Sequence, residues 1–168
     1  IRLHPDEPNL IKSKKQVKIM NKRILGIRII AVLAIIVSGV LVNAHYKVEP
    51  STLCVIGDNF DCDIVNKSPY STIDGIFYFI NSDLGINFPE LYFPLPVSAI
   101  SILMFGAIIL LTIKPKIKVL KTLMVLSILF SLYLIYIEAF ILLAYCIYCI
   151  ILDILIILET ILIWGIKE

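Results

Sequence analysis

Residues 119–166 read VLKTLMVLSILFSLYLIYIEAFILLAYCIYCIILDILIILETILIWGI. The charged side chains in this long apolar stretch are Lys121, Glu138, Asp153 and Glu159. As one straight helix the stretch would be about 72 Å long at 1.5 Å per residue, which is roughly twice the thickness of a bilayer core. The chain must therefore fold back within it, and we expect the turn near residues 140–145.

Two further apolar runs precede this stretch, and each is close to the roughly 20 residues that a membrane helix needs. The expected spans cover about residues 24–44, 95–113, 119–140 and 145–166. Only 17% of the residues are charged, against about 25% in a typical soluble domain. The sequence therefore predicts an all-α membrane protein. We expect a four-transmembrane-helix bundle over residues 24–166, a basic segment over 1–23, and a long loop over 45–94.

The distribution of charge predicts how the bundle is oriented. The basic residues before the first span are Arg2, Lys12, Lys14, Lys15, Lys18, Lys22 and Arg23. The connection after the second span adds Lys114, Lys116 and Lys118, whereas the loop over 45–94 has only two lysines and is rich in Asp and Glu. Since basic residues stay preferentially in the cytoplasm, we expect both termini in the cytoplasm and the long loop on the extracytoplasmic side.

The chain has four cysteines, in two pairs of different character. Cys54 and Cys62 lie in the outer loop, and Cys146 and Cys149 form a Cys-x-x-Cys motif at the start of the fourth span. The N-terminal end of a helix carries partial positive charge that stabilises a thiolate, which suits this motif to thiol–disulfide exchange. The expected topology places all four sulfurs on the oxidising, extracytoplasmic side, where an even number of cysteines indicates redox or structural pairs.

The residues alone leave three plainer interpretations of the cysteines open. Cys146 and Cys149 could be small buried hydrophobic residues. A Cys54–Cys62 bridge could be purely structural and stabilise the loop by about 2–3 kcal/mol. A zinc site is the weakest interpretation, because zinc prefers two closely spaced pairs, and no metal site is predicted. A second pair on the same side favours an electron relay over all three.

The order of these motifs resembles the vitamin K epoxide reductase family, including its bacterial and archaeal quinone-reducing homologues. The similarity runs over about residues 24–166. It rests on CVIGDNFDC at 54–62, DIVNKS at 63–68 with Tyr70 after it, and CIYC at 146–149. The resemblance implies a four-helix bundle around a quinone of the menaquinone, ubiquinone or vitamin K type, with the outer loop capping the active site.

The resemblance also implies a role for each cysteine. Cys54 would exchange with an external thiol protein, Cys62 would exchange with Cys146, and Cys149 would meet the quinone. Because no thioredoxin-like domain is fused to the chain, we expect a separate, extracytoplasmic thioredoxin-like partner. No nucleic-acid partner is expected. We expect the protein to reside in a prokaryotic cell membrane.

Five further residues are candidates for the quinone pocket. The loop serine of the family falls on Ser68, and Tyr70 follows it. Tyr145 and Tyr148 flank the Cys-x-x-Cys motif, although an interfacial aromatic belt explains them equally well. Asp153 shares one helix face with both cysteines of the motif, and an intramembrane carboxyl group is a functional candidate by default. It could hydrogen-bond or protonate a quinone oxygen, or pair with a polar group of another helix.

Two departures from the family pattern bear on the reaction. Vertebrate members have a tyrosine where this chain has Asp153, and their asparagine near the start of the second span has no clear equivalent around residues 94–97. Both departures favour simple quinone reduction over reduction of vitamin K epoxide. The sequence thus predicts a thiol oxidoreductase that supports disulfide bond formation. The alternatives are a vitamin K epoxide or vitamin K quinone reductase and, in another class, a non-enzymatic tetraspan scaffold with structural disulfides.

Overall fold

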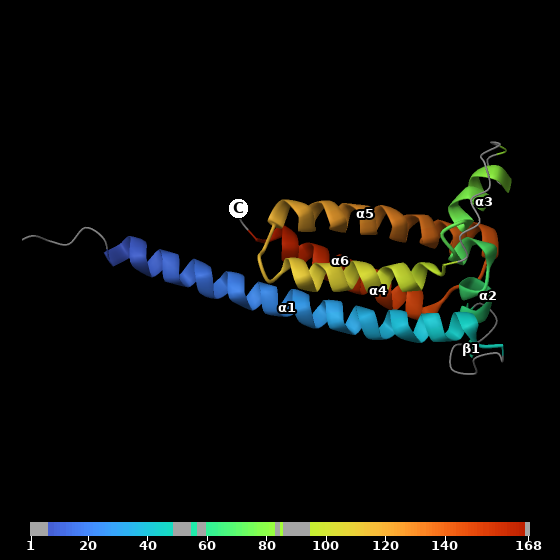
Figure 1. Cartoon of the computed structure of the whole chain (residues 1–168), viewed down its shortest axis with the longest axis horizontal. Coiled ribbons are helices and arrows are strands. Elements are labelled where there is room, and N and C mark those ends of the chain that lie inside the picture. Colours follow the sequence, from blue (N-terminus) through green and yellow to red (C-terminus); the bar gives the residue numbers. More distant parts are fainter. Residues whose placement is uncertain (1–6, 49–54, 57–59, 83–84, 86–94, 167–168) are drawn as a thin grey trace, which may run out of the picture.

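The computed structural model describes residues 7–48, 55–56, 60–82, 85 and 95–166. Four long helices lie side by side, and short elements gather at one end of them (Figure 1). The long helices are α1 (Glu7–Tyr46), α4 (Val97–Leu111), α5 (Ile117–Tyr136) and α6 (Ile147–Trp164). The short elements are β1 (Val55–Ile56), β2 (Phe60–Asp61), α2 (Cys62–Asn66), η1 (Pro69–Ser71), α3 (Gly75–Ser82) and the π-helix η2 (Ile137–Leu142). The segment 60–82 is called the cap below.

Three of the helical segments are long and apolar enough to cross a membrane: Ile19–Tyr46, Ile117–Leu142 and Ile147–Trp164. Helix α4 is also apolar but has 15 residues, which corresponds to about 22 Å. Large apolar side chains point outward from the bundle, among them Leu103 and Phe140, which are 69% and 72% exposed. Exposure of such a surface to lipid is favourable, whereas its exposure to water would be unfavourable. The predicted all-α membrane bundle is confirmed.

The helix boundaries differ from the expected spans at two places. Helix α1 begins at Glu7, inside the basic segment, and runs beyond the other helices (Figure 1). Residues 9–25 contain no Gly or Pro and are rich in residues that favour helix, so nothing interrupts it there. Helix α4 is shorter than the expected span because Pro96 is its N-cap and Thr112 its C-cap. The fold-back between the last two spans falls after η2, where Leu143 adopts a left-handed conformation with φ 51°.

One face of α1 forms the centre of the bundle. The buried residues Ile27, Ala31, Ala34, Ser38 and Leu41 recur every three or four positions, which is the spacing of a single helix face. This face packs on α4 and α6. Because several of its side chains are small, the helix backbones can approach closely.

Two arginines of α1 lie at the C-terminal ends of the helices that it packs against. Arg28 donates from Nε to Thr112 Oγ1 over 2.9 Å and from Nη2 to the Thr112 carbonyl over 3.1 Å. The Arg23 guanidinium lies against Gly165, the C-cap of α6, so closely that a side chain at Gly165 would displace it. A cation is favourable at a helix C-terminus, and both contacts fix the end of the bundle opposite the cap.

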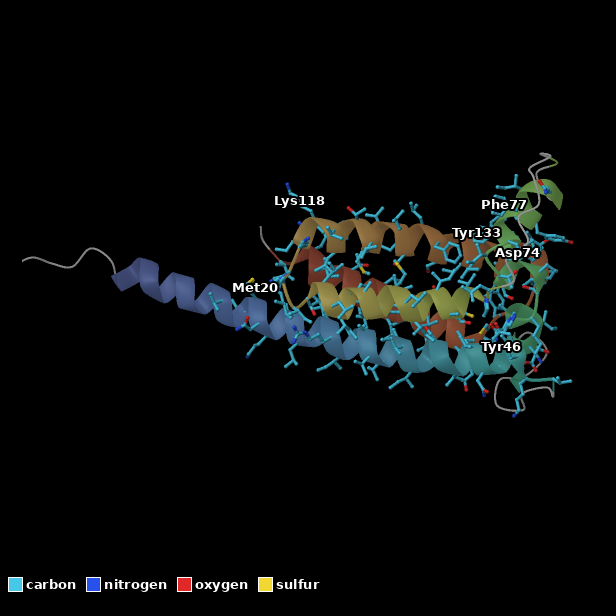
Figure 2. All side chains as sticks on the ribbon, viewed as in Figure 1. Met20, Tyr46, Asp74, Phe77, Lys118 and Tyr133 are labelled. Atoms are coloured by element: carbon cyan, nitrogen blue, oxygen red, sulfur yellow. The ribbon has the colours of Figure 1, made fainter. Side chains whose placement is uncertain are left out.

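The cap is fastened to the other end of the bundle by hydrogen bonds. Asn66 donates from Nδ2 to the Leu41 carbonyl over 2.7 Å, and the Asn66 carbonyl lies 2.5 Å from His45 Nδ1. The Tyr133 hydroxyl donates to the Gly75 carbonyl over 3.4 Å. Figure 2 shows Tyr46, Asp74, Phe77 and Tyr133 at this end, whereas Met20 and Lys118 lie toward the other end.

Candidate functional site

The described cysteines occur in two oxidation states. Cys62 is disulfide-bonded, whereas Cys146 and Cys149 are free thiols. Cys54, predicted to exchange with an external thiol protein, lies outside the described residues. The structure therefore combines an oxidised cysteine in the cap with a reduced Cys-x-x-Cys motif at the start of α6.

The chain segments that carry Cys62 and Cys146 are paired with each other. The backbone N–H of Asp61 donates to the Tyr145 carbonyl over 3.1 Å, and Phe60 forms a parallel β-bridge with Tyr145. Asp61 is also the N-cap of α2, because its carboxylate accepts hydrogen bonds from two backbone N–H groups of the first turn. Cys62 and Cys146 directly follow the paired residues, and both are almost fully buried in one apolar cluster.

The Cys-x-x-Cys motif forms the first turn of α6. Cys146 is the N-cap of the helix, and its Sγ accepts a hydrogen bond from the Cys149 backbone N–H over 3.3 Å. A sulfur in this place satisfies one of the free N–H groups at the helix start and faces the positive end of the helix dipole. Cys146 is completely buried, whereas Cys149 is only partly buried.

Cys149 opens into a cavity of about 380 Å³ between the cap, η2 and the four long helices. Most of its wall is apolar and comes from α4, α5 and α6. Its polar lining consists of Asn66, Ser68, Tyr70, Ser71, Ser98, Ser101, Ser127, Ser131, Glu138, Cys149 and Asp153. An apolar cavity of this size with a few polar groups is typical of a small-molecule site.

Asp153 contributes a carboxyl group to the wall of the cavity, one helical turn from Cys149. Its Oδ1 accepts a short hydrogen bond from the Ser131 hydroxyl of α5. This contact joins α5 to α6 and fixes the direction of the carboxyl group. Asp153 therefore has a polar partner on another helix, as one of its two predicted roles requires. It also faces the cavity, as the other role requires.

Glu138 is a residue of the site that the sequence analysis counted as a charge but gave no role. Its side chain is 5% exposed, its Oε2 accepts a hydrogen bond from the Cys146 backbone N–H over 3.2 Å, and its carboxyl group also contacts the Cys149 thiol. It also lines the cavity. The residue belongs to η2, and such π-helical turns are frequent at functional sites. The signal in the sequence was a carboxyl group eight residues before the motif, inside an apolar span.

Ser68 and Tyr70 both line the cavity, from the cap side. Ser68 donates from Oγ to the Val65 carbonyl over 2.8 Å, and the Tyr70 ring stands edge-on to Tyr78 at 5.2 Å. Ser98, in the first turn of α4, was not singled out in the sequence. Its buried hydroxyl lines the cavity and has no hydrogen-bond partner among the described residues. It is therefore available to a bound molecule.

Tyr145 and Tyr148, for which the sequence left a place beside the quinone and an interfacial belt equally open, are not among the residues that line this cavity. Tyr145 is 38% exposed, and its ring lies 6.0 Å from the ring of Phe60. Tyr145 precedes α6 in extended backbone and pairs with β2, which directs it toward that strand. Tyr148 lies one residue before Cys149, on a different face of α6.

The model of the "Vitamin K epoxide reductase family" matches residues 25–164. The matched range contains the cap, both pairs of cysteines and the cavity. No curated protein matched the chain.

Proposed function

Because the chain belongs to the vitamin K epoxide reductase family, we propose that it relays electrons from an external dithiol to a quinone and so supports disulfide bond formation. The family comprises membrane redox enzymes that act with quinones, so the chain is an oxidoreductase of the membrane with a quinone as cofactor. One observation carries the more specific proposal. The Cys149 thiol lines a cavity large enough for a small molecule. Disulfide-bonded Cys62 lies in α2, and the residues just before it pair with Tyr145 at the start of α6.

The relay consists of disulfide exchanges, each of which moves two electrons. An external dithiol reduces the Cys54–Cys62 disulfide and is itself oxidised to a disulfide. The Cys62 thiolate then attacks Cys146 in a Cys146–Cys149 disulfide, and Cys149 leaves as a thiolate. Cys54 resolves the mixed disulfide and restores the Cys54–Cys62 bond. The oxidised Cys62 and the free Cys146 and Cys149 of the structure correspond to the state that is ready to reduce a quinone.

The last step transfers two electrons from the Cys146 and Cys149 pair to the quinone, which also takes up two protons and becomes a quinol. In this proposal Cys149 faces the quinone, and Glu138 takes the proton of the Cys149 thiol that it contacts and returns it when Cys149 next leaves as a thiolate in the relay. Asp153, held by Ser131, provides a hydrogen bond or a proton to a quinone oxygen. Ser98 and Ser68 offer polar contacts on the opposite, cap-side portion of the wall.

We also propose that the cap and all four cysteines face the extracytoplasmic side of a prokaryotic cell membrane and that both termini are cytoplasmic. Lys118 lies at the end of the bundle opposite the cap (Figure 2), so the basic connection and the cap are on opposite sides. A separate thioredoxin-like protein would supply the dithiol at the cap. Intact cells should therefore allow a membrane-impermeant maleimide to label Cys54 or Cys62 after mild reduction. Labelling that requires opening of the cell would reverse the orientation.

The decisive experiment is anaerobic reduction of a short-chain quinone by the purified protein, with reduced thioredoxin as donor. We expect one quinol for each thioredoxin disulfide formed, measured by quinone absorbance and thiol titration. The Cys146→Ser variant is the control for direct reaction of thioredoxin with the quinone. Quinone reduction at the rate of that control would exclude the relay and favour the scaffold alternative.

A further inference from the structure

Glu159 of α6 carries a carboxyl group that the proposed relay does not use. Its side chain is completely buried, and neither carboxyl oxygen has a hydrogen-bond partner among the described residues. The two carboxyl groups at the cavity differ from Glu159 in this respect, because Glu138 accepts a hydrogen bond from the Cys146 backbone and Asp153 accepts one from Ser131. A buried polar group without a partner destabilises the fold, and acidic residues inside a membrane span usually serve a function.

The position of Glu159 places it between the cavity and the end of the bundle opposite the cap. The innermost residue of α6 that lines the cavity is Ile156. Glu159 follows three residues later, about 4.5 Å further along the helix axis. The helix ends at Trp164, about 7.5 Å beyond Glu159. Along the helix axis, Glu159 is thus nearer to the cavity than to the end of the helix.

A cation lies beyond Glu159, at the end of α6 opposite the cap. The Arg23 guanidinium lies against Gly165 there, and its Nη1 is buried without a hydrogen-bond partner among the described residues. On the other side, water that enters the polar part of the cavity could bridge toward Asp153.

We propose that Glu159 carries protons from the end of the bundle opposite the cap to the quinone in the cavity. This inference rests on the proposed quinone reduction. The external dithiol loses two electrons and releases two protons on the cap side of the membrane. The quinone gains the two electrons through Cys149 and two protons that enter through Glu159 and reach it by way of the cavity wall at Asp153, and no other reactant is needed. Each turnover therefore removes two protons from one side of the membrane and adds two to the other.

The inference can be tested in liposomes that contain the protein, a membrane-soluble menaquinone and an entrapped pH-sensitive dye. Reduced thioredoxin is added outside, so that only molecules with an outward-facing cap react. We expect the lumen to lose up to two protons per quinone reduced, and a protonophore should abolish this signal. In Glu159→Gln, which keeps the shape of the side chain but cannot carry a proton, we expect the lumen signal to disappear and quinone reduction to slow at least tenfold. Glu159→Asp should restore part of both.

The matched control is Thr160→Val, at the residue that follows Glu159 in α6. It removes a hydroxyl that donates to the Ile156 carbonyl and should change neither the lumen signal nor the rate of quinone reduction. Quinone reduction with protons taken from the outer medium would overturn the role of Glu159 and leave the relay intact. The same holds if Glu159→Gln acidifies the outer medium and alkalinises the lumen as the wild type does. Absence of quinone reduction in the wild type would overturn both. If Glu159→Gln does not fold, Glu159→Asp decides: its shorter side chain should lower both signals, and wild-type values of both would overturn the role of Glu159.

Discussion

The half of the bundle beneath the cap treats its buried polar groups differently from the half away from it. Beneath the cap, Glu138 and Asp153 both accept hydrogen bonds and both face a cavity. In the other half, Ile108 and Met124 are completely buried, and Glu159 is buried with no hydrogen-bond partner in the part of the chain that the structure describes. The comparison separates a preorganised reaction chamber from a close-packed stem in which the Glu159 carboxyl group has no hydrogen-bond partner among the described residues. The predictions below test this division.

The largest effect is expected at Cys149, in the chamber. The Cys149→Ser variant should lose quinone reduction completely, because the sulfur that meets the quinone is gone. Cys146 then lacks its resolving partner and should remain in a mixed disulfide with Cys62, while Cys54 becomes free. Mass spectrometry of the proteolysed, unreduced protein should identify the Cys62–Cys146 peptide pair.

The Cys146→Ser variant is the matched control for this assignment. It should also be inactive but should not accumulate a link from Cys149 to Cys62, since Cys149 faces the cavity and not the cap hairpin. A Cys54–Cys146 peptide pair in Cys149→Ser would reverse the assignment of Cys54 and Cys62. If neither variant forms a mixed disulfide, the relay between the pairs is wrong.

The second largest effect is expected at Glu138. Glu138→Gln can still accept the hydrogen bond of the Cys146 backbone but cannot take up the proton of Cys149. General-base groups typically contribute about 100-fold or more to a rate, and we expect a loss of quinone reduction of that order with an unchanged KM for the quinone. Stopped-flow absorbance measures both. A loss in Glu138→Leu without one in Glu138→Gln would show that Glu138 only positions the motif.

A smaller effect is expected at Asp153, because Ser131 and the cavity share its role. Asp153→Asn keeps an acceptor for Ser131 but lacks an acidic proton, and we expect turnover to fall about tenfold, which corresponds to ~1.4 kcal/mol. Ser131→Ala tests the supporting contact and should lower turnover less. Unchanged quinone reduction in Asp153→Ala would remove Asp153 from the mechanism.

These residues also show what a sequence can and cannot disclose about this fold. The apolar runs predicted the helices because membrane spans have a composition that leaves little ambiguity, and the spacing of Cys146 and Cys149 placed them on one helical turn. The partner of Glu138 could not be predicted. It depends on how many residues the π-helical turn contains before the chain reverses, and a one-residue change would rotate the carboxyl group away from Cys146. The direction of Tyr145 was equally hidden, since it follows from pairing with a cap strand far away in the sequence.

The smallest effect is expected in the stem, where packing and not chemistry dominates. Thr112 accepts from Arg28 through both its hydroxyl and its carbonyl oxygen. Thr112→Val keeps the shape and the carbonyl contact but loses the hydroxyl, so the charge-assisted hydrogen bond from Arg28 and the hydroxyl's own bond to the Ile109 carbonyl disappear. We expect the free energy of unfolding to fall by about 1–2 kcal/mol, with quinone reduction by the remaining folded protein unchanged.

Thermal unfolding in detergent, followed by circular dichroism, measures this change. Thr122→Val is the matched control, because the exposed Thr122 hydroxyl bonds only to the Lys118 carbonyl of its own helix, and its loss should have little effect. The outcome distinguishes the two halves of the bundle. A variant of the stem that lowers stability but not turnover has the opposite pattern to Glu138→Gln, which should lower turnover but not stability. If Thr112→Val slows quinone reduction as much as it lowers stability, the stem is coupled to the chamber through α4, and the division between the two halves is wrong.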